Sequence, residues 1–166
     1  EVAATRSRKA KVTALAGLLS RTPPEEVGLV VSYLGGRLLQ RRTGVGWRSL
    51  TSLPAPADEP SLTVVEVHEA FESLSALAGP GSAGARATGV ASLFGRATAE
   101  EQQWLRGLVT GEVRQGALDA VVQEALAVAG GVPLTVVRRA AMLAGSTVAI
   151  AEAALGEGEE GLARFR

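Results

Sequence analysis

Apolar residues recur along most of the chain at the spacing of a helix rather than that of a strand. Near the start, Val12, Leu15, Leu18 and Leu19 form one apolar stripe behind a basic segment. Strict alternation of apolar and polar residues, which is typical of half-buried strands, is scarce. The pattern therefore predicts an all-α fold, a single compact multi-helix domain with about eight or nine helices.

Local start signals place several of these helices. Residues 22–25, 63–66 and 98–101 each have a threonine followed three residues later by a glutamate, which is the pattern of a capping box. The first of these also has proline in the expected first turn. Three further hydroxyl side chains are expected to cap helices: Ser82, Thr135 and Ser146. Residues 117–129 predict another strong helix, ended by Gly130 and Gly131.

A proline-rich stretch divides the sequence into two parts that resemble each other. Residues 54–61 hold three prolines and favour neither a helix nor a central strand. The capping boxes at Thr22 and Thr98 lie 76 residues apart, and a glycine-containing turn follows each of them. We therefore expect an internal pseudo-twofold repeat, with half 1 at about 1–53, a crossover at 54–61 and half 2 at about 62–166.

Composition removes several classes of function. The 166 residues are 46% hydrophobic and contain no cysteine and one histidine, His68. Disulfide scaffolds, thiolate zinc sites and cysteine nucleophiles are therefore excluded, and we expect no metal site. Neither GxxxxGK(S/T) nor GxSxG occurs, and the two lysines, Lys9 and Lys11, are expected to be exposed, so no catalytic residue is predicted. No apolar run reaches the length of a membrane span, and no signal-peptide cleavage site follows the basic start.

The charge balance is uneven. Lysine plus arginine equals aspartate plus glutamate at 17 each, but residues 1–50 hold nine basic and three acidic side chains. A basic third of this kind either forms a face that binds polyanions or is an ordinary solvated surface.

Three glycine turns carry the candidate chemistry. Gly44–Gly46 follows two arginines and precedes Arg48, and Arg114 stands two residues before Gly116. In the third turn, Gly79–Ser82, the side chain of Arg86 is expected one helical turn further on. Glycine lets a phosphate approach the backbone at a helix start, and arginine adds a two-pronged donor. Each turn alone is more typical of a structural role, but the first two turns together with the basic first segment are equally consistent with phosphate binding. Trp47 is interpreted as a sugar contact or as a core or boundary residue, Trp104 as core and His68 as surface or boundary.

These stretches, in this order, resemble the N-terminal DNA-binding domain of ATP-dependent DNA ligases of the eukaryotic, archaeal and actinobacterial kind. The strongest single piece is the turn Gly111–Gly116 with its following helix. The matching segments cover nearly the whole chain: 11–19, 44–50, 62–68, 79–82 with Arg86, 93–94, and 110–116 with 125–127.

The resemblance implies an all-α domain that grips nicked double-stranded DNA without reading its sequence. The remaining ligase domains in cis would then seal the nick. It implies ATP and Mg for the parent enzyme but no cofactor in this domain, a monomer, no membrane partner, and a cytoplasmic, nucleoid-associated bacterial protein. The DNA-binding residues that it implies, together with Arg48 from its place beside the first turn, are Gly44, Val45, Gly46, Arg48, Ser82, Arg86, Arg114 and Gly116, and as a looser match Arg8, Lys9 and Lys11.

The sequence also departs from the family pattern. Trp47 stands where the family often has an acidic residue, and Arg86 is the single basic residue where the family often has two lysines. The adenylation motif Lys-x-Asp-Gly is absent, so the chain alone is expected to be inactive. The alternative interpretation is a helical protein–protein adaptor, which predicts an exposed apolar groove rather than arginines that share one face.

Overall fold

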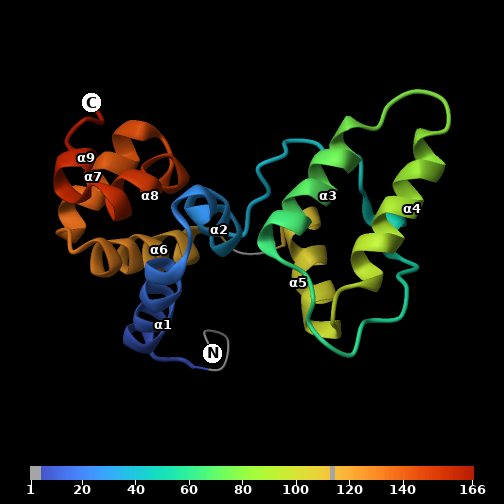
Figure 1. Ribbon diagram of the computed structural model, residues 1–166, viewed down its shortest axis with the longest axis horizontal. Coiled ribbons are helices and arrows are strands. Elements are labelled where there is room, and N and C mark those ends of the chain that lie inside the picture. The colour runs from blue at the N-terminus through green and yellow to red at the C-terminus, as the bar shows by residue number, and fades with distance from the viewer. Residues whose placement is uncertain (1–4, 113–114) are drawn as a thin grey trace. The chain divides into compact units, whose positions relative to one another are not determined.

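The computed structural model describes residues 5–112 and 115–166, and these residues form helices and no strand. Figure 1 shows the elements in chain order. They are α1 (Arg8–Arg21), η2 (Pro24–Glu26), α2 (Val27–Leu34), η3 (Trp47–Leu50), α3 (Val64–Ala76), α4 (Ser82–Gly95), α5 (Ala99–Thr110), α6 (Gln115–Gly130), α7 (Leu134–Ala144), α8 (Thr147–Gly156) and α9 (Gly158–Leu162), where η marks a 3-10 helix. The predicted all-α fold is confirmed.

The chain forms two compact units. Unit 1 consists of Glu1–Gly35 together with Arg114–Arg166, and unit 2 of Gly36–Val113. The proline-rich residues 54–61 lie inside unit 2. The internal repeat stays a prediction.

Unit 1 is built on the long helix α6. Helix α1 packs along α6, α2 packs against α8, and α7 and α9 complete the cluster around α8. Its interior is made almost entirely of aliphatic side chains, as the low aromatic content requires. The fully buried members include Leu19, Val27, Val122, Leu126, Val137, Ile150 and Leu162.

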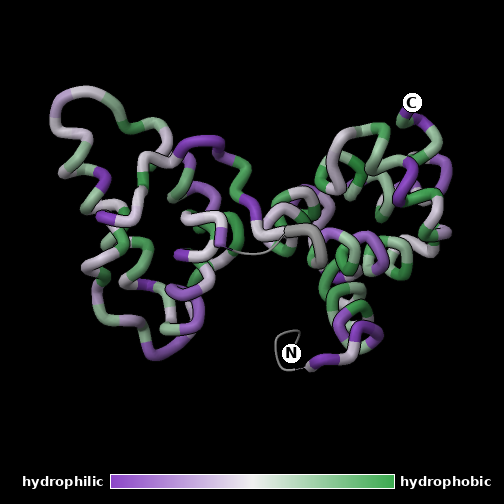
Figure 2. Tube along the Cα trace, turned by 180° about the vertical axis from the view of Figure 1, so that it is seen from behind, coloured by the Kyte–Doolittle hydropathy of each residue, from purple (hydrophilic) through white to green (hydrophobic). Residues whose placement is uncertain are grey.

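Unit 2 holds α3, α4 and α5 around two buried phenylalanines, Phe71 and Phe94. The proline-rich segment is fixed to this core through Gln102 on α5. The Gln102 amide donates hydrogen bonds to the carbonyls of Pro54 at 3.1 Å and Phe94 at 2.8 Å. Apolar and polar residues mix along the helices of both units, as expected of amphipathic helices with one buried face (Figure 2).

Two capping boxes form as predicted. The hydroxyls of Thr63 and Thr98 accept hydrogen bonds from the backbone N–H groups of Glu66 and Glu101, and each glutamate side chain bonds back to the threonine N–H. The predicted cap at Ser146 is also present, because its hydroxyl accepts from the N–H of Ala149. All three motifs act within one helical turn, which explains why local sequence sufficed.

Three other predicted caps are wrong. Thr22 lies at the end of α1, where its hydroxyl donates to the carbonyl of Leu18, and the prolines after it start the 3-10 helix η2 without a side-chain cap. Ser82 is the first residue of α4, and Gly81, with φ of +80°, occupies the cap position. Thr135 lies inside α7, because Pro133 occupies the N-cap position and makes no side-chain capping hydrogen bond. Proline and glycine geometry thus displaced each hydroxyl from its expected position.

Within the described residues, no helix is long and apolar enough to cross a membrane.

Candidate nucleic-acid interface

The first glycine turn is a compact loop in unit 2 that stands at the start of η3. Gly44 adopts a φ of +71°, a left-handed conformation that costs other residues free energy. The hydroxyl of the buried Thr43 accepts a hydrogen bond from the N–H of Val45 at 3.1 Å. Gly46 is extended, with φ of −117°, and its surroundings leave open space for a side chain. The loop is therefore internally fixed at Gly44 and open at Gly46.

Arg86, one turn into α4, packs directly on this loop. A Cβ atom at position 44 would lie 2.5 Å from Nε and 2.8 Å from Cζ of Arg86. The Nη2 atom of Arg86 donates to the carbonyl of Leu77 at 3.1 Å. Leu77 follows α3 and comes two residues before Gly79, so Arg86 connects the Gly44 turn to the segment that leads into the Gly79–Ser82 turn.

The structure thus brings together two of the three predicted turns through one side chain. The guanidinium of Arg86 is half-buried and partly engaged inside unit 2, which gives it a positioning role for the Gly44 turn. Contact between Arg86 or Ser82 and a phosphate stays a prediction.

Exposed groups surround the turn. Arg48 lies in η3 with its side chain exposed, and the neighbouring Trp47 is 55% exposed. The guanidinium of Arg106 on α5 lies over the Trp47 ring, with Cζ 5.9 Å from the ring centroid. Sequence reasoning missed Arg106, because it lies 59 positions after Trp47 and only tertiary packing places it there.

Trp104 is not the core residue that the sequence predicted. It lies mid-helix in α5 beside Leu105 and Leu108, but 40% of its surface is exposed, whereas those two leucines are buried. The apolar stripe of α5 is therefore narrower than the sequence pattern indicated. His68 is partly exposed, as predicted, and its Nδ1 lies 3.2 Å from the Gln40 amide nitrogen.

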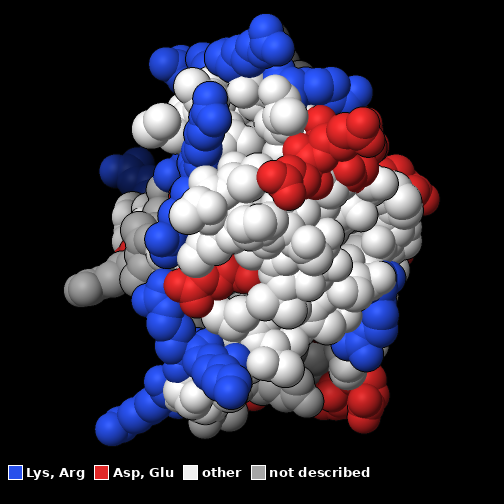
Figure 3. All heavy atoms as spheres, turned by 90° about the vertical axis from the view of Figure 1, so that its left-hand side faces the viewer, with Lys and Arg blue, Asp and Glu red and all other residues white. Residues whose placement is uncertain are grey.

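The remaining candidates belong to unit 1. Lys9 is exposed and Lys11 is half-buried in the first turn of α1, and Gly116 is the second residue of α6. Arg114 lies outside the described residues. Figure 3 shows basic side chains down one side and across the top of this view, with acidic side chains mostly on other parts of the same face.

Arg8 is already paired within unit 1. Its Nε donates to Glu124 on α6 at 3.1 Å, and Arg138 Nη2 lies 3.9 Å from the same carboxylate. The hydrogen bond from Arg8 is the main cause that holds the pKa of the Glu124 carboxyl below its usual range; burial opposes it, and the charges of Arg8 and Arg138 add to the lowering. Arg8 therefore stabilises the packing of α1 on α6, and its contact with DNA stays a prediction.

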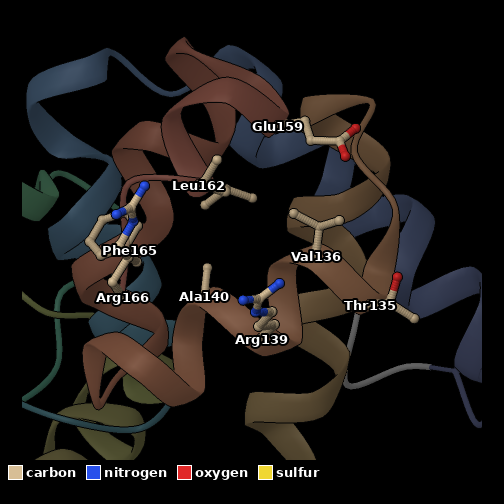
Figure 4. Close-up of a pocket in the computed structure, with 9 residues that line it drawn as sticks. Thr135, Val136, Arg139, Ala140, Glu159, Leu162, Phe165 and Arg166 are labelled. Carbon is tan, nitrogen blue, oxygen red and sulfur yellow. The ribbon is translucent and has the colours of Figure 1, made fainter.

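A hollow of 680 Å³ in unit 1 lies between α7, α9 and the last residues (Figure 4). Arg139 points into it from α7 beside Ala140, and Leu162 lines the opposite side. Its described lining residues include no nucleophile paired with a base. Within the described ranges, no group of three or more His, Asp or Glu side chains is placed to hold a metal ion.

Unit 2 also carries the kind of groove that the adaptor alternative predicts. A hollow of 310 Å³ runs between α3 and α4, lined by leucines and small residues, with the ion pair of Arg96 and Glu66 at its edge. Leu62, Leu74, Leu77 and Leu93 supply its apolar lining.

Known proteins resemble this chain along most of its length. Residues 46–127 match the family described as the DNA ligase N terminus. The chain belongs to the DNA ligase N-terminal family. Three relatives are each named a probable DNA ligase. The relative from a Nocardioides species is 68% identical over 92% of this chain and 31% of its own length. The relative from Kineococcus radiotolerans is 63% identical over 99% of this chain and 33% of its own length. The relative from Streptomyces griseus is 52% identical over 100% of this chain and 32% of its own length.

This ligase N-terminal domain spans about a third of the length of the curated relatives that it matches. The residues matched by the family begin at Gly46 and include Arg48, Ser82, Arg86 and Arg106.

Proposed function

We propose that this chain is the duplex-DNA-binding domain of an ATP-dependent DNA ligase and that it holds nicked DNA for sealing by the other domains of the parent enzyme. The observation that carries the proposal is the Gly44–Gly46 turn, which Arg86 braces from inside while Arg48 stays exposed beside it. Membership of the ligase N-terminal family supports the same substrate.

The mode of contact follows from the residue types. Arginine and exposed backbone at a glycine turn suit phosphate oxygens, which are the same at every base pair. Binding of this kind positions a duplex without reading its sequence, which is what a ligase that seals nicks anywhere requires.

The chemistry of sealing belongs to the rest of the parent enzyme. The sequence has no Lys-x-Asp-Gly motif, and the described residues offer no carboxylate cluster for Mg. We therefore place ATP and Mg in the domains that would act in cis with this one. We further propose that the parent acts in the bacterial cytoplasm, near the nucleoid, and that this domain is monomeric.

A salt titration tests the proposal. Labelled nicked duplex is titrated with the 166-residue chain at several salt concentrations. Five or six basic contacts predict a slope of log K against log salt of about −5. Arg48→Ala should reduce the magnitude of this slope by about 0.9.

The matched control is Arg21→Ala, which removes an exposed arginine at the end of α1, away from the glycine turns in the sequence. Its slope should stay that of the parent chain. Absence of binding at low salt, or a slope near zero, would contradict the proposal.

The groove between α3 and α4 favours a second candidate, a helical adaptor that binds a protein segment. An adaptor predicts no salt-dependent DNA binding. It predicts instead that Ala85→Gln, which places an uncharged polar side chain in the groove, weakens partner binding. Under the DNA-binding proposal, Ala85→Gln changes no charge and leaves the affinity for nicked duplex unchanged.

A further inference from the structure

An exposed aromatic side chain stands immediately after the glycine turn. Trp47 follows Gly46 directly, is the first residue of η3, and keeps 55% of its surface in solvent. Burying a tryptophan is strongly favourable, and the fold leaves more than half of the surface of Trp47 in solvent.

The ring is also held in place. The guanidinium of Arg106 lies over it at 5.9 Å, in cation–π geometry, and Leu50, at the other end of η3, is buried. An aromatic ring that is both exposed and oriented loses little conformational freedom when a flat surface packs on it.

We propose that Trp47 is a non-ionic contact residue for a DNA strand, with the ring packed against the sugar edge or an unstacked base next to the phosphates that the Gly44–Gly46 turn receives. Arg106 is a positioning residue that orients the ring. The inference rests on the proposed function, and it adds to that function a contact that does not depend on charge.

Charge complementarity selects the occupant. Arg48 is the next residue in the chain and Arg106 covers the ring, and within the described residues neither has an ion-pair partner. An aromatic side chain among arginines of this kind fits a polyanion that carries apolar rings and sugars, which is the composition of a nucleic-acid strand.

The chain makes the test direct, because it has two tryptophans. Trp104→Phe leaves Trp47 as the sole indole, and Trp47→Phe leaves Trp104 as the matched control. Each single-tryptophan chain is titrated with nicked duplex while its fluorescence is recorded. Trp47 fluorescence should change on binding, and Trp104 fluorescence should stay constant.

Affinity supplies the second measurement. Trp47→Ala in the full chain should weaken binding of nicked duplex about tenfold and leave the salt slope unchanged, since an aromatic contact releases no counterions. Trp47→Tyr should recover most of the loss. Arg106→Ala should weaken binding less than Trp47→Ala and broaden the Trp47 emission. Because Trp47 is exposed, its variants should unfold at the same urea concentration as the parent chain.

The outcomes separate this inference from the function on which it rests. Binding with a steep salt slope, together with silent Trp47 fluorescence or unchanged affinity of Trp47→Ala, would overturn the contact and leave the DNA-binding function standing. A change in self-association alone, measured by light scattering, would identify position 47 as a contact between copies and would also overturn it. No binding of DNA by any chain would overturn both.

Discussion

The guanidinium of Arg86 occupies the space where a side chain at position 44 would begin. A Cβ atom on Gly44 would lie 2.5 Å from Arg86 Nε, and the same guanidinium donates to the Leu77 carbonyl at 3.1 Å. Two features therefore require glycine at position 44: its left-handed φ and the close approach of Arg86 from α4. The shape of the proposed DNA-binding turn depends on a residue 42 positions later in the chain.

We expect Gly44→Ala to lower the free energy of unfolding by about 2 kcal/mol or more. The left-handed φ alone costs an alanine about 1–2 kcal/mol, and the contact with Arg86 adds to it. Urea unfolding followed by tryptophan fluorescence measures this loss of stability. The signal reports on unit 2, which contains Gly44 and both tryptophans.

The control for this variant is Gly46→Ala. Gly46 has an extended φ, and a Cβ atom at this position would have no neighbour within 4 Å, so we expect a change below about 0.5 kcal/mol. Equal costs at 44 and 46 would show that Arg86 does not constrain the turn.

A double-mutant cycle isolates the contact between positions 44 and 86. Arg86→Ala should cost about 2 kcal/mol, because the hydrogen bond from its charged group to the Leu77 carbonyl is lost. In that background Gly44→Ala should keep only its backbone strain, so the two costs should fall short of additivity by about 1 kcal/mol. Additive costs, measured by the same urea unfolding, would mean that the two residues act independently.

Loss of an arginine contact to phosphate should lower the affinity by the same factor for every DNA sequence. We expect Arg48→Ala, and equally Arg114→Ala, to weaken binding of several unrelated nicked duplexes by the same factor, since neither reads a base edge. Competition between duplexes of different sequence measures this. A variant that changes the order of preference among sequences would argue for base contacts instead.

The single tyrosine gives a pH prediction for unit 1. Tyr33 on α2 is 4% exposed, and burial raises the pKa of its phenol to about 12. The folded chain thus favours the neutral phenol. The stabilisation that the folded chain gains from the neutral, buried Tyr33 phenol is complete below the unfolded pKa, near 10. It is lost as the pH rises through the folded pKa of about 12.

An alkaline titration followed by tyrosinate absorbance should show one transition near pH 12 in the folded chain, and one near pH 10 in urea. The assignment is unambiguous because the sequence has one tyrosine. A transition near pH 10 in the folded chain would show that solvent reaches the Tyr33 hydroxyl.

The sequence by itself determined the helical class and those features that act within one turn. The capping boxes at Thr63 and Thr98 formed as predicted because both partners stand three residues apart. The glycine turn at 44–46 was also found, since a left-handed φ is a local demand on a residue type. Thr22 and Ser82 were misplaced where a proline or a neighbouring glycine competed for the same local geometry.

Only the tertiary structure decided which of these local features meet. Arg86 covers Gly44, Arg106 covers Trp47, and Trp104 faces solvent because of how α4, α5 and η3 pack together. Both arginine contacts join residues that are about 40 to 60 positions apart, far beyond the reach of helical periodicity. Periodicity says which face of a helix is apolar, but the partner of that face is chosen by the summed packing of the whole core, which no single stretch of sequence encodes.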